Sequence, residues 1–337
     1  MLKFRILIDN RPSCRPAIQS TLQSTLQSEL QSEHGLSIFI EYNGTRILCD
    51  TGASSAFIEN AAALGINLQQ TDLCVISHGH SDHTGGLLTL LEHLKQPEHS
   101  EHPEHSEPLD YGNSPKVYLS GQIKGEKYYS TRRGLPRDIS TDSQVFAKHS
   151  NLLHTVSGSR WITPEIALVK CSCNSHPQPQ GNKFLGAVSL EHENCAQKRC
   201  AQENAINQEQ NAFTHLISYD KFGHELALAI NTPQGVAIFS PCSHNGLFNI
   251  IESAMEFTGA SKLLAFIGGL HLVDGCETHQ EITQMASTFI KKYPDAQLFT
   301  GHCTGDMATE IFSSIFSHDA LVSNTFQIFH TGYEYIF

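Results

Sequence analysis

The chain has 337 residues, 39% of them hydrophobic, and a net charge of −12 when histidine is counted as neutral. Such an acidic chain lacks the basic face that non-specific nucleic-acid binding requires, and no apolar run approaches the length of a membrane span. Residues 1–9 alternate in polarity instead of forming an apolar signal region, so reduced cysteines and a cytoplasmic location are expected.

Strands and helices alternate along most of the chain. Residues 1–9 predict a first strand, and Asn43-Gly44 predicts a hairpin between strands at 36–42 and 45–49. The later elements, in chain order, are a helix at 53–64, a strand at 73–77, a helix at 87–95, a strand at 116–119, a hairpin at 226–231 and 235–240, a helix at 249–257, a strand at 263–267, a helix at 280–292, a strand at 297–300 and a helix at 308–316. Hairpins followed by βαβ units predict an α/β fold with two sheets packed face to face and helices outside.

Three segments differ in composition from the rest and are interpreted as surface insertions in one domain that spans 1–337. Residues 15–34 contain Thr-Leu-Gln-Ser repeats, and residues 96–115 contain Pro-Glu-His-Ser repeats with almost no apolar side chains. Residues 172–212 are rich in Gln, Asn, Glu and Cys. Such compositions favour exposed loops over a packed core.

The run at 77–83 reads Ser-His-Gly-His-Ser-Asp-His and directly follows the apolar residues 73–76. In extended chain, residues two apart point the same way, so His78 and His80 can grip one ion. Asp82 and His83 lie where the chain turns into the next helix and can face a second ion. Four imidazole or carboxylate ligands within six residues predict a transition-metal site, with zinc, iron or manganese as the metal.

Other ligands are expected at the ends of later strands, because one segment cannot complete two metal shells. His244, His271 and His302 each follow an apolar strand and lie beside glycine. Functional side chains commonly cluster at such strand ends, so we expect these histidines to complete the metal site.

The His-x-His-x-Asp-His pattern at 78–83 resembles the signature of the metallo-β-lactamase superfamily, and residues 50–52 (Asp-Thr-Gly) resemble its preceding Asp-x-Gly segment. The ordered set of four histidine motifs is similar to one subgroup, the dihydropterin-methyl-ribofuranosylaminobenzene-phosphate synthase-like metal-dependent hydrolases, and His302 resembles the last metal histidine of the family. The resemblance implies a four-layer αβ/βα sandwich with surface insertions that binds one or two zinc ions, with iron or manganese as alternatives.

The chain departs from the family at one position. Many superfamily hydrolases carry a Gly-Asp pair whose Asp bridges two metals, whereas this chain has Pro241-Cys242 after the strand at 235–240. Either Cys242 takes that place as a ligand, or no carboxylate bridges the ions and the second site is weak. In the latter case His244 and His271 share the remaining ligand roles.

This resemblance and the ligand set predict a metal-dependent hydrolase. A metal-bound hydroxide would attack a small, anionic or phosphorylated substrate, because a metal lowers the pKa of its bound water. Asp82 would orient the nucleophile or hold the second ion, and His271 would donate a proton if it is not a ligand. Two alternatives stay open: a pterin-related transferase that releases pyrophosphate, and a non-catalytic metal-binding sensor.

A basic cluster lies within 124–137 of this acidic chain. Lys127, Arg132 and Arg133 are candidates for binding a substrate phosphate, with Lys124 and Arg137 nearby. The interleaved tyrosines at 128 and 129 suggest a surface on which a planar ring could stack; the alternative is an exposed polar loop.

A second, weaker candidate for a zinc site lies within residues 171–200. The residues concerned are Cys171, Cys173, His176, Cys195 and Cys200. Their spacing does not match a regular zinc finger.

Overall fold

The computed structural model describes residues 1–13, 29–95, 115–191, 216–318, 322 and 325–337. Two seven-stranded sheets form its centre. The strands of the first sheet, in spatial order, are β18 (Glu334–Ile336), β1 (Leu2–Ile8), β2 (Ser37–Tyr42), β3 (Thr45–Cys49), β4 (Leu73–Val75), β5 (Lys116–Ser120) and β8 (Leu153–Val156). Those of the second are β17 (Phe326–Ile328), β16 (Gln297–Thr300), β15 (Leu263–Ile267), β14 (Gly235–Phe239), β13 (Leu226–Thr232), β10 (Ile166–Lys170) and β9 (Arg160–Trp161).

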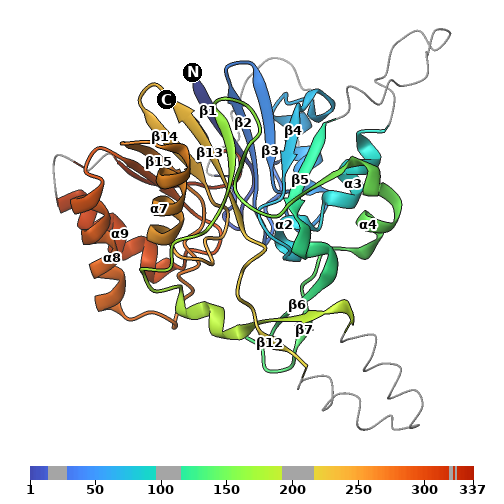
Figure 1. Ribbon diagram of the computed structural model, residues 1–337. Helices are drawn as coiled ribbons and strands as arrows, with labels where there is room; N and C mark the ends of the chain where they lie inside the picture. The colour runs from blue at the N-terminus through green and yellow to red at the C-terminus, as the bar shows by residue number, and fades with distance from the viewer. Residues whose placement is uncertain (14–28, 96–114, 192–215, 319–321, 323–324) are drawn as a thin grey trace.

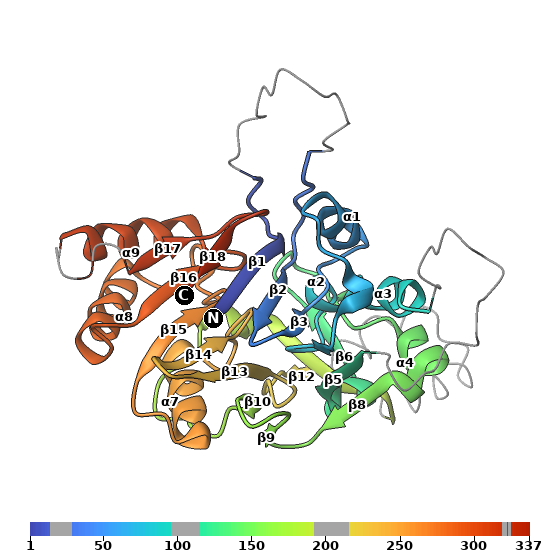
Figure 2. The same ribbon diagram turned by 90° about the horizontal axis from the view of Figure 1, so that it is seen from above.

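Helices cover the outer face of each sheet (Figures 1 and 2). On the first sheet these are α1 (Ala56–Ala63), α3 (Leu87–His93) and α4 (Ser143–His149). On the second they are α7 (Leu247–Thr258), α8 (His279–Lys292) and α9 (Asp306–His318). Short helical turns are α2 (Ser81–Thr84), η1 (Leu68–Gln70), η4 (Gly121–Gly125), η5 (Ser150–Leu152) and η6 (Gln180–Phe184). The predicted four-layer αβ/βα sandwich is therefore confirmed. None of the helices described has the length and hydropathy needed to cross a membrane.

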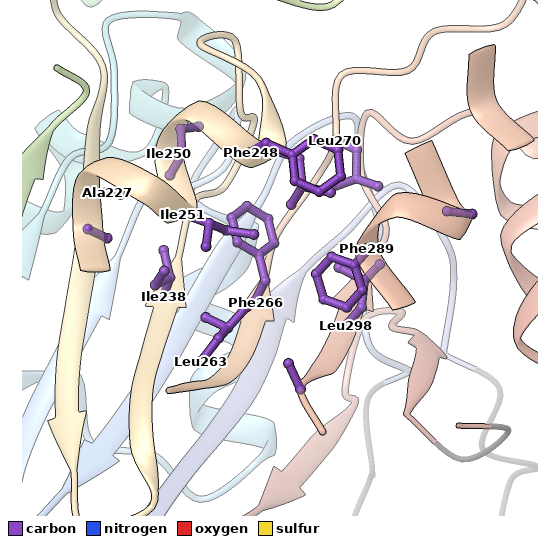
Figure 3. Close-up of a cluster of buried hydrophobic side chains, with 14 of the residues drawn as sticks. Ala227, Ile238, Phe248, Ile250, Ile251, Leu263, Phe266, Leu270, Phe289 and Leu298 are labelled. Atoms are coloured by element: carbon purple, nitrogen blue, oxygen red, sulfur yellow. The ribbon is translucent and has the colours of Figure 1, made fainter. Parts of the chain in front are cut away.

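The central strands are apolar on both faces because each face is buried. In β2, Ile38 and Ile40 point into the core between the sheets, whereas Phe39 packs under the helices. Phe4 of β1 joins the two sheets, since its ring contacts that of Phe299 at 5.2 Å between centroids. On the outer face of the second sheet, α7 packs Ile250 and other apolar side chains against β13, β14 and β15 (Figure 3).

The predicted hairpin at 36–49 is present as β2 and β3. Asn43 and Gly44 have φ values of 49° and 85°, as a two-residue hairpin turn requires. The predicted helices are present with ends shifted by up to a few residues; for example, the helix expected at 249–257 is α7, Leu247–Thr258.

A third, four-stranded sheet was not predicted. It contains β12 (Ser218–Tyr219), β11 (Leu185–Ser189), β6 (Glu126–Ser130) and β7 (Arg137–Asp138), and β6, β7 and β12 lie below the sandwich in Figure 1. Only β6 and β7 are joined by a short turn; β11 begins at Leu185 and β12 at Ser218, so no local turn signal links the other strands. The sheet closes the end of the sandwich at which the histidine motifs lie.

The parallel register of the second sheet explains why its histidine motifs meet. Phe239 of β14 pairs with Ile267 of β15, which pairs with Phe299 of β16. The residues that follow these three strands therefore leave the sheet at the same level. In the first sheet Cys49 pairs with Val75, which brings the residues after β3 and β4 to the facing edge.

Candidate metal centre

The run at 77–83 leaves β4 and is fixed by Asp50, which follows β3. The Asp50 carboxylate accepts hydrogen bonds from the Ser77 backbone N–H (2.7 Å) and hydroxyl (2.6 Å). Gly79 is required for packing, because a Cβ there would lie 2.3 Å from the buried ring of Tyr128. The short α2 then begins after His80 and turns the remaining motif residues back towards the site.

A first donor group consists of His78, His80 and His244. Their ligand atoms all lie within 4.8 Å of one another, and the Nε2 atoms of His78 and His244 are 3.3 Å apart. All three side chains are buried. Burial, and then the neighbouring histidines, lower the pKa of His78 and His244, and burial lowers that of His80. Low pKa values keep the rings neutral, which is the form that binds metals.

A second donor group consists of Asp82, His83 and His302. The Nε2 atoms of the two histidines are 3.0 Å apart, and Asp82 Oδ2 lies 3.7 Å from His83 Nε2 and 3.5 Å from His302 Nε2. Burial alone would raise the pKa of Asp82, but His83 and His302 hold it well below its usual value. This group thus pairs a carboxylate anion with two imidazoles.

Cys242 lies between the two donor groups. Its Sγ is within 4.8 Å of ligand atoms of His78 and His83, one from each group, and of His302 as well. This is the position that the missing bridging Asp would be expected to take. Cys303, which sequence analysis did not single out, has its Sγ 3.2 Å from that of Cys242.

His271 lies at the edge of the first donor group. Its Nδ1 is 3.5 Å from Cys242 Sγ, and its ring centroid is 4.2 Å from that of His244. The glycines before it make this approach feasible, since a Cβ at Gly269 would lie 2.5 Å from Cys303 Sγ.

Four histidines of the two groups have their other ring nitrogen held by a hydrogen bond. The partners are Ser77 Oγ for His78 (2.8 Å), Asp50 Oδ2 for His83 (2.7 Å), Asn182 Oδ1 for His244 (3.2 Å) and Asn10 Oδ1 for His302 (3.1 Å). Metal-binding histidines are typically oriented by such contacts, which fix the ring and its tautomer.

The residues present fit a transition-metal ion. The donors are imidazole, carboxylate and thiol, a set suited to zinc. The second group also attracts positive charge: burial alone would lower the pKa of His302, but the negative charges of Cys303 and Asp82 raise it to about 9. A proton is thus held where a cation would bind.

A cavity of about 790 Å³ opens onto both groups. The donors His80, Asp82, Cys242, His244, His271 and His302 line one wall. The lining also includes apolar side chains in or next to the small sheet: Ile139 directly after β7, Phe184 at the end of η6 and Leu185 at the start of β11.

Part of the predicted basic cluster also lines this cavity. Arg132, Arg133 and Arg137 lie on its wall, and the only polar contact found for Arg132 among the described residues is a long one to the Asp274 carbonyl (3.5 Å). Lys127 is not part of the wall, and its Nζ lies 3.5 Å from Asp138. The expected stacking surface is wrong: the Tyr128 and Tyr129 side chains are buried and cannot stack on a ligand at the surface.

Two segments interpreted as peripheral insertions reach the site. The Glu33 carboxylate accepts hydrogen bonds from the backbone of Ala53 and Ser54, which positions His34 at the cavity. His34 stacks on His302, and its Nε2 is 3.5 Å from Asp82 Oδ2. The interpretation of 15–34 and 172–212 as surface decoration is therefore wrong for residues 31–34 and for 180–189, which contain Asn182 and β11. Most of 96–115 lies outside the described residues.

The second candidate zinc site is only partly described, because Cys195 and Cys200 lie outside the described residues. Cys173 Sγ lies 3.1 Å from one oxygen of Glu252, and His176 Nε2 lies 2.7 Å from the other. These contacts are hydrogen bonds to a shared carboxylate, and Lys292 pairs with the same group. A metal site there stays a prediction.

Comparisons with known proteins agree with this geometry. The profile of the metallo-β-lactamase superfamily matches residues 32–155. The chain is 29% identical over 312 residues to the 7,8-dihydropterin-6-methyl-4-(β-D-ribofuranosyl)-aminobenzene-5′-phosphate synthase of Methanocaldococcus jannaschii, covering 89% of this chain and 88% of the relative. It is 24% identical to an uncharacterised protein of the same organism, covering 84% and 88% of the two chains.

A solved structure shares the fold over the whole length. It is described as a metal-dependent hydrolase of the β-lactamase superfamily, is 21% identical, and superposes with a TM-score of 0.66 over 100% of this chain and 99% of the other. The signature at 78–83, the αβ/βα sandwich and these matches agree with one another. The chain is therefore similar to the metallo-β-lactamase superfamily, whose profile matches residues 32–155.

Proposed function

We propose that the protein is a metal-dependent hydrolase of a small anionic molecule that carries a phosphate. The observation that carries the proposal is the shared cavity: two donor groups for metals line one wall, and three arginines line another. No ion pair to Arg133 or Arg137 is found among the described residues, so their charges are free to meet an anion. In a chain of net charge −12, such a local concentration of cations favours an anionic ligand.

In this proposal His78, His80 and His244 hold one ion, and Asp82, His83 and His302 hold another, with Cys242 between them. Zinc is the expected metal, and iron and manganese are the alternatives; the bound metal supplies a Lewis acid that lowers the pKa of water and polarises the electrophile. Arg132 and Arg133 bind the phosphate, and the Asp82 carboxylate helps to orient the attacking water. His271, on the same wall, donates a proton to the leaving group.

The test replaces His80 or Asp82 by Ala in the full chain reconstituted with zinc. Activity is measured with p-nitrophenyl phosphate and bis(p-nitrophenyl) phosphate, metal content by elemental analysis and folding by circular dichroism. We expect each variant to lose the metal of its own donor group and its activity, and to keep the fold. Full activity in a variant shown to be free of metal would contradict the proposal.

A second function, a pterin-related transferase that releases pyrophosphate, is favoured by the name of the Methanocaldococcus relative, which is a synthase. The same arginines would then bind the diphosphate of one substrate. Product analysis separates the two reactions. A hydrolase releases phosphate or pyrophosphate from a pterin diphosphate alone, whereas a transferase releases pyrophosphate only when an aromatic phosphate acceptor is also present.

A further inference from the structure

A buried polar segment lies beside the first donor group and has no part in the function proposed above. It comprises residues 220–225, between β12 and β13, and is called here the 220–225 segment. The side chains of Asp220, Phe222, His224 and Glu225 are buried, with relative exposures of 1–3%. Burying an ionisable side chain lowers the stability of the folded protein unless the side chain is paired. The contacts of this segment therefore require an explanation.

The tautomer of His224 follows from its two contacts. The Gly79 backbone N–H donates to His224 Nδ1 (3.1 Å), so that nitrogen carries no proton. The proton is therefore on Nε2, which donates to Asp220 Oδ2 at 3.0 Å. The other oxygen, Oδ1, accepts the Phe222 backbone N–H (2.7 Å). Although Asp220, His224 and His80 lie close enough to share a metal, this hydrogen bonding uses the atoms that would bind it.

Asp220 is also the carboxylate that faces His80. The distance from Asp220 Oδ2 to His80 Nε2 is 3.8 Å, an electrostatic contact rather than a hydrogen bond. His80 Nε2 is buried and has no hydrogen-bond partner. A carboxylate at this place favours a proton on Nε2 and leaves Nδ1 with the lone pair that a metal needs.

The same segment fixes His244. The Phe222 ring stacks on the His244 ring, with centroids 4.4 Å apart and an interplanar angle of 6°. The Glu225 carboxylate accepts the backbone N–H groups of His244 (2.7 Å) and Asn245 (2.8 Å). These bonds hold the turn at Ser243, whose φ of 56° is in the left-handed region.

We propose that the 220–225 segment is the positioning element of the first donor group. Asp220, held by His224, sets the tautomer of His80, and Phe222 with Glu225 sets the place of His244. The second donor group depends on other residues, since Asp50 orients His83 and Asn10 orients His302. The inference rests on the proposed role of His78, His80 and His244 as metal ligands, and it predicts that the two groups can be weakened separately.

The decisive variant is Asp220→Asn in the full chain. The amide keeps the shape but can donate to His80 Nε2, which favours the tautomer that cannot offer Nδ1 to a metal. We expect zinc affinity at the first donor group to fall by about 10- to 100-fold, with the second group within about threefold of wild type, in chelator competition. Asp295→Asn, an exposed carboxylate paired with Lys262, is the matched control and should change neither affinity.

A spectroscopic readout separates positioning from a general loss of packing. Histidine ¹⁵N chemical shifts of the zinc-loaded protein should show His80 protonated on Nε2 in wild type and not in Asp220→Asn. His224→Gln should keep the affinity, because its amide can accept from Gly79 and donate to Asp220, whereas His224→Ala should lower it as Asp220→Asn does.

Two results would contradict the inference. The first leaves the proposed function intact, and the second contradicts the proposed function as well. If Asp220→Asn and His224→Ala bind zinc at the first donor group as wild type does, with an unchanged His80 tautomer, the positioning role is wrong and the proposed function stands. If the wild-type protein binds no metal through His78, His80 and His244, both are wrong.

Discussion

At the scale of single residues, the centre depends on close contacts that only particular side chains permit. Gly79 allows the histidine motif to pass over Tyr128, and Gly269 leaves space for the sulfur of Cys303. Asp50 binds both the Ser77 backbone and the His83 ring. These residues contribute no metal ligand, yet the ligands reach their places only through them.

Gly79→Ala should therefore destabilise the protein. The added Cβ would lie 2.3 Å from the Tyr128 ring, which is buried and cannot move aside. Overpacking of this kind costs about 1–3 kcal/mol of the free energy of unfolding. Urea denaturation measures the change, with Gly125→Ala as the control because a Cβ there meets nothing within 4 Å. Equal stability of the two variants would contradict the packing argument.

The raised pKa of His302 predicts proton release on zinc binding. With a pKa of about 9, the ring is protonated near pH 7 in the metal-free chain, so a metal at the second donor group must displace that proton. The zinc affinity of the second donor group should therefore rise about tenfold per pH unit until the pH approaches 9. His78 and His244, with lowered pKa values, are already neutral, so the first donor group should show little dependence between pH 7 and 8.5. Chelator competition at several pH values tests this, and equal slopes for the two groups would contradict it.

At the scale of elements, the β6–β7 hairpin brings charge to the cavity. Arg132 and Arg133 lie in the turn that joins the two strands, and Arg137 begins β7. The hairpin belongs to the small sheet, whose other strands β11 and β12 come from a distant part of the chain. In the proposed function, contacts with the substrate would thus come from a different sheet than the proposed metal donors.

Arg133→Ala should raise KM for a phosphorylated substrate while kcat changes little. Loss of one charge-assisted contact to an anion costs about 1.5–3 kcal/mol, or roughly 10- to 100-fold in KM. The matched control is Lys124→Ala, because Lys124 is exposed and does not line the cavity. An unchanged KM in Arg133→Ala would argue against a phosphate at this wall.

At the scale of the whole molecule, each sheet supplies part of the centre. His78, His80, Asp82 and His83 leave the first sheet, and Cys242, His244, His271 and His302 leave the second. A bound metal therefore links the two halves of the sandwich in the folded state only. Such a ligand stabilises the native state by mass action.

Removal of metal should accordingly lower stability. Free zinc at about 100 times its dissociation constant should add about 2.7 kcal/mol per site to the free energy of unfolding. Thermal unfolding with zinc, and after treatment with a chelator, measures the difference. The Asp82→Ala variant should lose most of the zinc-dependent stabilisation that comes from the second donor group. If zinc raises the free energy of unfolding of this variant as much as that of wild type, Asp82 is not a ligand of that group.

Local signals in the sequence predicted most of the sandwich. The hairpin at 36–49 follows from Asn43-Gly44, and the apolar periodicity of 249–257 predicts α7 because one face of that helix must be buried. The small sheet could not be predicted in this way, since its short strands pair across long separations. Composition was also misleading for 31–34 and 180–189, where polar residues serve the site.

The sequence predicted the candidate site only in part. The four ligands at 78–83 are adjacent in sequence, so their chemistry is visible without a structure. His34, Asn182 and Asp220 became visible only when the fold brought them beside the ligands, because a buried polar residue is identified by its tertiary partners. Cys303, next to His302, could have been noticed as a thiol beside an expected ligand.

The separation between the small sheet and the sandwich has a consequence for how such a protein can diverge. In the proposed function, the arginines that would bind the substrate's phosphate lie on or beside the β6–β7 hairpin, whereas the proposed metal donors follow strands of the two large sheets. Substitutions or changes of length in the hairpin can alter which molecule is accepted while the donors stay in place. If the proposed roles hold, substrate selectivity and metal chemistry depend on separate parts of the chain, and the residues for one can change while those for the other are preserved.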